Sequence, residues 1–333
     1  MGSELIPPGL TYLADNIISK QNILGVSKEQ SARWAKDLNL PKKSETVFFA
    51  GCGYQFSGQL ETLMSLIRRT DSYIGAELPL RFTSFQKKLG FNLPGIYSKV
   101  LAKAGDTKAQ PLKAAVRVLG NLGVEFGYLA DDEPCCGAPL YNAGLHKEFA
   151  QNARRAYQKL KSLGVRRVIS IVPSCTYAIL RLFPLYVEGF DLEVRHFLEV
   201  VLERISSREL RFPREVKVTY HDPCQLSRYL GLIEEPRRIL RAVKGIELVE
   251  TDWTRGEWST CCGGGGGFEA VFPELSQMLA VNRAKELVET GAKIIATQCP
   301  GCVLQLKAGL KELKADDVEV LDLAQIVAMA MET

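Results

Sequence analysis

The chain has 333 residues, of which 46% are hydrophobic and 24% are charged, and its formal net charge is +4. This is the composition of a globular protein long enough for two domains of ordinary size. It contains no long run of lysine and arginine and no apolar stretch near the roughly 18 residues of a membrane-spanning helix, so nucleic-acid binding and membrane insertion have no support.

In the first half, short apolar runs alternate with helical patterns. Residues 1–44 contain a helix-like stretch without cysteine and are expected to form an N-terminal helical connector. The expected elements that follow are a strand at residues 45–50, a helix near 58–69, a strand near 124–129, a helix over 145–163 and a strand at 168–172.

The second half repeats this order. Its expected elements are strands at residues 216–220 and 247–250, a helix over 273–290 and a strand at 293–297. Strands that alternate with helices predict a mainly parallel sheet in each half.

An internal duplication explains the repeated order. Residues 164–175 align without a gap on residues 291–302, so that Cys175 matches Cys302 and Val172 stands where Cys299 stands. The expected architecture is therefore α/β, with a first domain at residues 45–210, a second at 211–333 and pseudo-symmetry between them. The first copy also carries extra residues near 70–115, which are expected to form either a docking element or a surface insertion.

All nine cysteines belong to two versions of one pattern. The first set is Cys52, Cys135, Cys136 and Cys175, and the second set is Cys224, Cys261, Cys262, Cys299 and Cys302. Both sets are expected at the carboxyl ends of strands, where ligands collect in α/β sheets. Clustered thiolates hold soft metals or iron–sulfur clusters.

The number of thiols separates the candidate metals. A single tetrahedral zinc ion uses four ligands, so five thiols favour an iron–sulfur cluster at the second set. Four thiols at the first set suit a second iron–sulfur cluster or zinc. Disulfides are disfavoured because adjacent cysteines rarely bridge comfortably, and because the absence of a secretory signal predicts a reducing cytoplasmic location.

The glycines that follow the second cysteine pair are candidate cofactor-binding residues. Gly263, Gly264 and Gly265 let the backbone approach the cluster and point N–H groups at its sulfurs. The run lacks the lysine and the spacing of a phosphate-binding loop, so phosphate binding is disfavoured.

Two polar residues just before Cys224 are candidate catalytic groups. His221 and Asp222 are expected either to donate a proton to a leaving thiolate or, alternatively, to be structural, with Asp222 capping the following helix. The acidic residues at 131–133 are expected in a solvated loop. Arg228, Arg237 and Arg238 are expected on a solvated helix face.

Three motifs carry a resemblance to a known family. Tyr220-His-Asp-Pro-Cys224, Cys261-Cys-Gly-Gly-Gly-Gly-Gly267 and Thr297-Gln-Cys-Pro-Gly-Cys302 together resemble the CCG-domain proteins, and in particular the CCG-domain subunit of heterodisulfide reductase and the matching half of its fused form. The resemblance covers about residues 45–325. It implies a noncubane [4Fe-4S] cluster on the five second-set cysteines, which reduces a disulfide homolytically. It carries over less fully to the first set, because Val172 replaces one cysteine there.

The same resemblance implies partners. The segment from Asn16 to Trp34 is similar to the connector that follows a ferredoxin-like domain in fused family members. A separate ferredoxin-like iron–sulfur subunit, similar to the one in heterodisulfide reductase, is therefore the expected partner, and a flavoprotein subunit is a further candidate. The expected substrate is a thiol or disulfide, and docking on a membrane complex stays open.

Three functions are compatible with these residues. The first is a catalytic subunit for thiol–disulfide or sulfur-compound redox chemistry, that is, a disulfide-reductase-like oxidoreductase within a complex. The second is a pure electron-transfer subunit that links a flavoprotein dehydrogenase to a quinone or carrier. The third is a scaffold with two structural zinc ions. The five-cysteine set favours the first of these.

Overall fold

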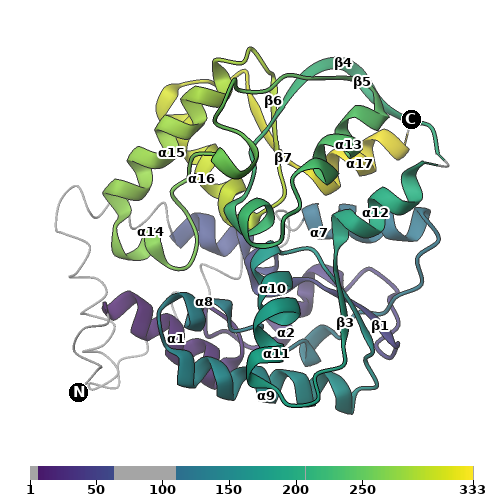
Figure 1. Ribbon diagram of the computed structural model, residues 1–333, viewed down its shortest axis with the longest axis vertical. Coiled ribbons are helices and arrows are strands. Elements are labelled where there is room, and N and C mark those ends of the chain that lie inside the picture. The colour runs from purple at the N-terminus through teal and green to yellow at the C-terminus, as the bar shows by residue number, and fades with distance from the viewer. Residues whose placement is uncertain (1–6, 64–109, 207, 333) are drawn as a thin grey trace.

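Two parallel sheets organise the computed structural model, which describes residues 7–63, 110–206 and 208–332 (Figure 1). The strands are β1 (Thr46–Phe49), β2 (Arg167–Ser170), β3 (Glu193–His196), β4 (Leu210–Tyr220), β5 (Val243–Leu248), β6 (Ile294–Thr297) and β7 (Glu319–Asp322). The first sheet has the order β1-β2-β3 and the second has the order β5-β4-β6-β7, with parallel pairing in both. The predicted α/β class, with one small parallel sheet in each half, is confirmed.

Helices connect the strands and cover the sheets. They are α1 (Pro8–Lys20), α2 (Lys28–Ala32), α3 (Gly51–Gln55), α7 (Gln110–Asn121), α8 (Ala138–Asn142), α9 (His146–Ser162), α10 (Pro173–Tyr177), α11 (Phe183–Tyr186), α12 (Phe197–Ile205), α13 (Glu234–Ala242), α14 (Phe268–Val271), α15 (Pro273–Val288), α16 (Pro300–Leu313) and α17 (Leu323–Met331). The two long helices predicted from the sequence, α9 and α15, are confirmed. Within the described ranges, no helix combines the length and the apolar character needed to cross a bilayer.

The strand order repeats between the two halves. β1, β2 and β3 of the first sheet correspond to β4, β6 and β7 of the second, and β2 and β6 hold the same place in the aligned repeat. Both central strands are buried, since three of four residues in β2 and all four in β6 have no substantial exposure. The duplication inferred from the sequence is therefore confirmed in the sheet topology.

The strand predicted near residues 124–129 is reduced to a single parallel bridge between Val47 and Gly127. The Phe48 N–H donates to the carbonyl of Gly127 at 2.8 Å, but the next residue turns away, because the Tyr128 N–H donates to the Pro41 carbonyl at 2.8 Å instead. The prediction of a full strand there is wrong. Its counterpart in the second sheet is β5, which begins four residues before the predicted strand at 247–250 and overlaps its first two residues.

The remaining predicted segments fall partly outside the described residues. Residues 57–63 of the expected helix near 58–69 are helical, and the rest of that helix is not described. Of the extra segment near 70–115, only residues 110–115 are described, and they begin α7. Leu112 and Ala115 there are fully buried, so this end of the segment belongs to the core and is not a surface insertion. The predicted domain boundaries stay a prediction.

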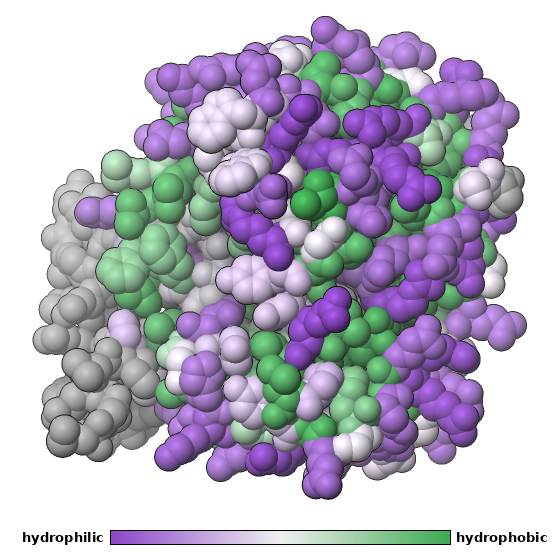
Figure 2. Space-filling model, viewed as in Figure 1, coloured by the Kyte–Doolittle hydropathy of each residue, from purple (hydrophilic) through white to green (hydrophobic). Residues whose placement is uncertain are grey.

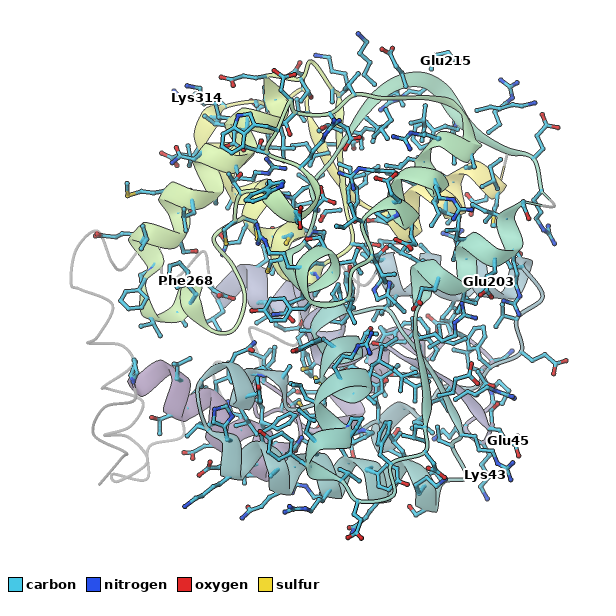
Figure 3. The ribbon with its side chains drawn as sticks, in the orientation of Figure 1. Lys43, Glu45, Glu203, Glu215, Phe268 and Lys314 are labelled. Atoms are coloured by element: carbon cyan, nitrogen blue, oxygen red, sulfur yellow. The ribbon has the colours of Figure 1, made fainter. Side chains whose placement is uncertain are left out.

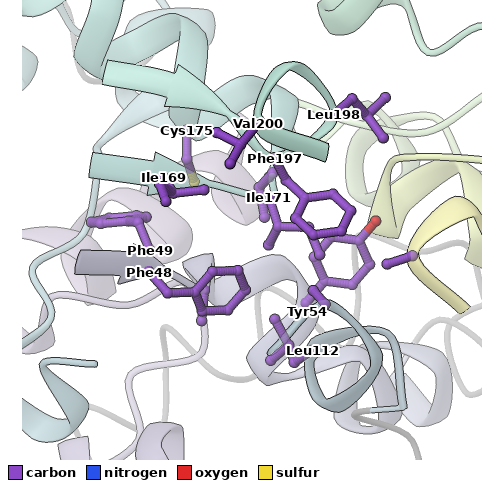
Figure 4. Close-up of a cluster of buried hydrophobic side chains, with 14 of the residues drawn as sticks. Phe48, Phe49, Tyr54, Leu112, Ile169, Ile171, Cys175, Phe197, Leu198 and Val200 are labelled. Carbon is purple, nitrogen blue, oxygen red and sulfur yellow. The ribbon is translucent and has the colours of Figure 1, made fainter. Parts of the chain in front are cut away.

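The core joins the two halves. α17, at the end of the second half, packs against α7 of the first half and against β4. Figure 4 shows Phe48, Tyr54, Leu112 and Phe197 gathered in one apolar cluster, and each of these side chains is at most 1% exposed. Burial of a large apolar side chain contributes about 1.5–3 kcal/mol, so this cluster is a major source of stability.

Charged side chains lie at the outer edge of the protein, as those of Glu45, Glu203 and Lys314 do in Figure 3.

His196 caps α12 from inside this core. Its Nδ1 accepts from the Leu198 N–H at 3.3 Å, its Nε2 lies 3.2 Å from the Ile171 carbonyl, and its backbone N–H donates to the Glu199 carboxylate at 2.7 Å. Since the ring is fully buried, burial lowers the pKa of His196 from 6.5 to about 3. The ring is therefore neutral in the folded protein.

This neutral cap predicts a pH-dependent stability. Between pH 6.5 and about 3 the unfolded chain binds a proton at His196 that the folded chain does not bind, so the free energy of unfolding falls as the pH falls through that window. The limiting slope for one proton is about 1.4 kcal/mol per pH unit. We expect His196→Asn, which keeps a capping side chain, to flatten this dependence when denaturant unfolding is compared between pH 6 and pH 4. An equal slope in both proteins would contradict the assignment.

Candidate metal centres

The first cysteine set meets at the carboxyl ends of β1 and β2. Cys52 lies in the first turn of α3, Cys135 and Cys136 lie in the loop before α8, and Cys175 lies in α10. The Sγ atoms of Cys136 and Cys175 are 3.1 Å apart, and Cys52 contacts Cys135. All four thiols therefore face one another in a single site, of which only Cys52 retains partial exposure.

The second set meets at the carboxyl ends of β4 and β6. Cys224 follows β4 at the start of the π-helical turn η5 (Gln225–Tyr229), Cys261 and Cys262 lie in the loop before α14, and Cys299 and Cys302 begin α16. The Sγ atoms of Cys262 and Cys302 are 3.2 Å apart. Burial, with the charges of Cys299 and Cys262, raises the pKa of Cys224 to about 11.

The two sites differ in exposure. Cys261 is exposed and Cys224 and Cys299 are half-buried, whereas three of the four first-set cysteines are buried. In the segment before Cys261, Trp253 and Trp258 are 72% and 70% exposed. Hydrophobic residues also gather on the surface over α14 and α15 (Figure 2). The second site is therefore the more exposed of the two.

Backbone N–H groups reach sulfur at matching places in both sites. The Gly263 N–H donates to Cys261 Sγ at 3.3 Å, and the Gly137 N–H donates to Cys135 Sγ at 3.5 Å. Gly265 does not do this, because its N–H donates to the Glu269 carboxylate at 2.9 Å. Gly264 instead allows close packing, since a Cβ there would lie 2.7 Å from Cγ of Gln305. Of the three predicted glycines, only Gly263 points its N–H at a sulfur.

His221 lies beside the second-set thiols. Its side chain is 1% exposed, and its ring nitrogen and the sulfurs of Cys262 and Cys302 all lie within 4.8 Å of one another. Arg283 of α15 approaches from the other side, with its Nε 3.1 Å from His221 Nδ1. His221 thus lies against the second-set thiols, and its catalytic role stays a prediction; Arg283 was not identified from the sequence.

Asp222 is held in a buried ion pair. Its two carboxylate oxygens accept from Nη1 and Nη2 of Arg237 at 2.7 and 2.8 Å, and one of them also accepts from the Gly256 N–H at 2.8 Å. Arg237 bonds Glu250 as well and is 2% exposed. The Asp222 side chain therefore does not cap the next helix, and its charge is paired with that of Arg237.

Two other charged residues that were expected to be exposed to solvent are buried. Arg237 is not on a solvated face, because Asp222 and Glu250 neutralise it inside the protein; Arg228 and Arg238 are exposed as predicted. Glu133 is not in a solvated loop, although Asp131 and Asp132 are exposed.

Glu133 belongs to the first site. Its carboxylate accepts from the N–H groups of Ala50 and Gly51 at 2.8 and 3.0 Å and from Gln55 at 2.8 Å. Burial raises the pKa of Glu133 to about 7. Lys28 donates to its backbone carbonyl at 2.5 Å. The helical segment before β1 therefore closes over this site.

A buried hydrogen-bond network lies between the two sites. Tyr54, two residues after Cys52, donates to the carboxylate of Asp322, and the side-chain amide of Gln298, the neighbour of Cys299, donates to the same carboxylate at 3.0 Å. A Cβ on Gly53 would lie 2.7 Å from Cγ of Pro300, so the two cysteine-bearing turns touch. Burial raises the pKa of Asp322 to about 7.

The donor sets fit thiolate-bound metal groups. Five sulfurs with no carboxylate among them suit an iron–sulfur cluster at the second site, and four sulfurs suit a cluster or a zinc ion at the first. The Nη2 of the fully buried Arg283 has no hydrogen-bond partner among the described residues. A buried donor without a partner is costly, so an acceptor such as a cluster or substrate atom suits this place.

One known protein family matches this chain twice, once in each half. The cysteine-rich domain family CCG matches residues 100–180 and again residues 218–307, which is 171 of the 333 residues. The two matched ranges contain eight of the nine cysteines, from Cys135 to Cys302, including all five of the second set.

Several curated relatives are iron–sulfur or redox proteins by name. One subunit of the dihydromethanophenazine:CoB–CoM heterodisulfide reductase of Methanosarcina acetivorans is 35% identical over 224 residues, which cover 66% of this chain and 54% of that protein. The EtfAB:quinone oxidoreductase of Syntrophomonas wolfei is 31% identical, with 66% and 32% covered. One subunit of the fumarate reductase (CoM/CoB) of Methanothermobacter marburgensis is 31% identical, with 65% and 42% covered. The chain thus spans about half or less of the length of these relatives.

The first prediction from this geometry concerns the adjacent cysteines. Cys262 and Cys136 hold matching places beside Cys302 and Cys175. We expect Cys262→Ala to remove the metal of the second site, about four iron atoms if that site holds one four-iron cluster, and to leave the first site loaded. Cys136→Ala is the matched control, with the opposite result. Metal content and absorption spectra after anaerobic purification measure both, and an unchanged iron content in Cys262→Ala would exclude it as a ligand.

The second prediction concerns the glycine run. Gly263 and Gly265 both have positive φ, +82° and +106°, so alanine at either place costs about 1–3 kcal/mol in backbone strain. A Cβ at position 263 would also collide with the Ser276 carbonyl, whereas at 265 it would meet open space. We expect Gly263→Ala to lower the free energy of unfolding and the iron content more than Gly265→Ala. Equal losses would show that the contact with α15 is unimportant.

Proposed function

We propose that this chain, which belongs to the CCG family of cysteine-rich domains, is the iron–sulfur subunit of a heterodisulfide-reductase-like complex. The reaction would be thiol–disulfide or sulfur-compound redox chemistry at a noncubane [4Fe-4S] cluster on the second cysteine set. This makes the chain an oxidoreductase acting on sulfur groups as one part of a complex.

The observation that carries the proposal is the convergence of five thiols from three loops on one partly exposed site. Cys262 Sγ lies 3.2 Å from Cys302 Sγ, Cys224 is close enough to Cys299 and Cys262 that, besides burial, their charges raise its pKa, and Cys261 is exposed. Three loops can surround a compact inorganic core, and the exposed edge leaves a side from which a substrate sulfur can approach.

The cluster, when bound there, would supply one-electron chemistry at iron next to the substrate sulfur. The five cysteines would hold it, and the Gly263 N–H would keep its hydrogen bond to Cys261 Sγ. His221 would place its ring beside Cys262 and Cys302. Asp222 would act as a positioning residue, because its ion pair with Arg237 fixes the loop that presents Cys224.

The first set would hold a second iron–sulfur cluster or a zinc ion on Cys52, Cys135, Cys136 and Cys175. The segment that carries Lys28 covers the first site, and three of the four cysteines there are buried. This supports a relay or structural role for the first site and not a substrate site. The close approach of Gly53 to Pro300, which brings the two cysteine-bearing turns together, supports an electron relay between the sites.

The partners would be those expected for a heterodisulfide-reductase-like complex. A ferredoxin-like iron–sulfur subunit, similar to the one in heterodisulfide reductase, would deliver electrons, and a flavoprotein subunit is a further candidate. We place the protein in the cytoplasm, with docking on a membrane complex as an additional arrangement.

A second candidate function is favoured by one of the comparisons. The similarity to an EtfAB:quinone oxidoreductase supports a pure electron-transfer subunit that links a flavoprotein dehydrogenase to a quinone or carrier. The same cysteines would then hold clusters without binding a substrate sulfur.

The third prediction tests the proposal through metal content. After strictly anaerobic purification we expect about four to eight iron atoms per chain with matching acid-labile sulfide, or about four iron atoms with one zinc ion at the first site. Zinc with negligible iron would reject the redox function. In loaded protein, a disulfide substrate should change the EPR signal of the second site. An unchanged signal, with electron transfer to a carrier intact, would favour the electron-transfer function.

A further inference from the structure

Arg283 has an unusual position for an arginine. It lies on α15 with its side chain fully buried, and it donates through Nε to His221 Nδ1 at 3.1 Å. Its Nη1 donates to Glu286 at 2.7 Å and contacts the hydroxyls of Thr254 and Thr260 at 3.2 and 3.3 Å. These contacts fix the guanidinium plane, so its Nε–H points at the histidine ring.

An arginine determines where the proton of that ring lies. The guanidinium group has only donors and stays charged, so the nitrogen that faces it must be an acceptor. Nδ1 of His221 therefore carries no proton, and the proton of the neutral ring is on Nε2. The backbone of His221 is also fixed, since its N–H donates to the Ala296 carbonyl at 2.9 Å and its own carbonyl accepts from Thr297 at 3.1 Å.

The His221 ring also lies beside sulfur. His221, Cys262 and Cys302 bring their ring nitrogen and sulfur atoms within 4.8 Å of one another, which is the spacing of a three-ligand metal site. A histidine binds a metal through an unprotonated nitrogen and normally donates its other N–H to a carboxylate, carbonyl or water. Here that arrangement would set the Nδ1 proton against the Nε–H of Arg283, so two donors would face each other.

We propose that Arg283 is a positioning residue that fixes His221 as an Nε2–H donor to the sulfurs of Cys262 and Cys302 and prevents it from becoming a metal ligand. The inference rests on the proposed cluster at the second site. A hydrogen bond to a ligand sulfur stabilises the more negative, reduced state of a cluster and so raises its reduction potential. Arg283 thus sets the potential through His221, and the hydrogen bonds that it makes in the structure include none to a sulfur.

The first test locates the ring proton in the full-length, oxidised wild-type protein. Long-range ¹H–¹⁵N NMR distinguishes the two ring tautomers, and the chain has only three histidines, so His221→Asn assigns the signal by its loss. We expect the proton on Nε2. A proton on Nδ1 would overturn the proposal, because Arg283 could not then donate to that nitrogen.

The second test measures the reduction potential of the second site with its iron content. We expect Arg283→Met, which removes every donor, to shift the potential to a lower value at unchanged iron content. Arg283→Lys, which restores one donor, should recover part of the shift, and His221→Asn should lower the potential as Arg283→Met does. Equal potentials in wild type and Arg283→Met would overturn the proposal.

Pulsed EPR of the reduced wild-type protein adds a direct check on ligation. We expect only the weak nitrogen coupling of a hydrogen-bonded ring, and a strong coupling from directly bound nitrogen would overturn the proposal. If Arg283→Met fails to fold, the wild-type tautomer and nitrogen coupling still decide the question. If wild-type protein holds no iron, the proposed function fails, while the tautomer still decides whether Arg283 fixes the ring.

Discussion

The hydrogen bond from Tyr54 to Asp322 joins the two halves of the protein between its two cysteine sites. Asp322 is fully buried, and a buried carboxylate is tolerated only where hydrogen bonds compensate for lost water. It obtains them from Tyr54, from Gln298 and from the Ala324 N–H that it caps in α17. Because Tyr54 follows Cys52 closely and Gln298 precedes Cys299, one network sets the placement of ligand-bearing turns in both sites.

The two halves share a backbone plan but differ in the polar groups placed on it. His196 is the last residue of β3 in the first half, and Asp322 is the last residue of its counterpart β7 in the second half. Both side chains cap the helix that follows. Two residues before the adjacent cysteines, Glu133 stands where Ser259 stands. The sheets and loops therefore tolerate either residue, and the differences lie where each site meets its surroundings.

The cysteine pattern was predictable because it depends on local order along the chain. Apolar runs fixed the buried strands, and cysteines just after those runs had to meet at one edge of a parallel sheet. Burial of charge was not predictable in this way. Arg237, Arg283 and Glu133 look like surface residues in the sequence, and each is buried with polar partners that compensate for its desolvation, such as Asp222 for Arg237 and Glu286 for Arg283.

The two sites also differ in the charged groups near their thiols. At the first site the pKa of Cys52 is raised by its hydrogen bond to Cys135 and by burial, and the nearby charge of Glu133 raises it further. That carboxylate disfavours additional thiolates, although Lys28 partly offsets it. At the second site a serine takes the place of that glutamate, and the buried guanidinium of Arg283 lies one histidine away from the thiols. A positive charge held in a low-dielectric interior stabilises nearby negative charge, and here the ion pair of Arg283 with Glu286 reduces that effect.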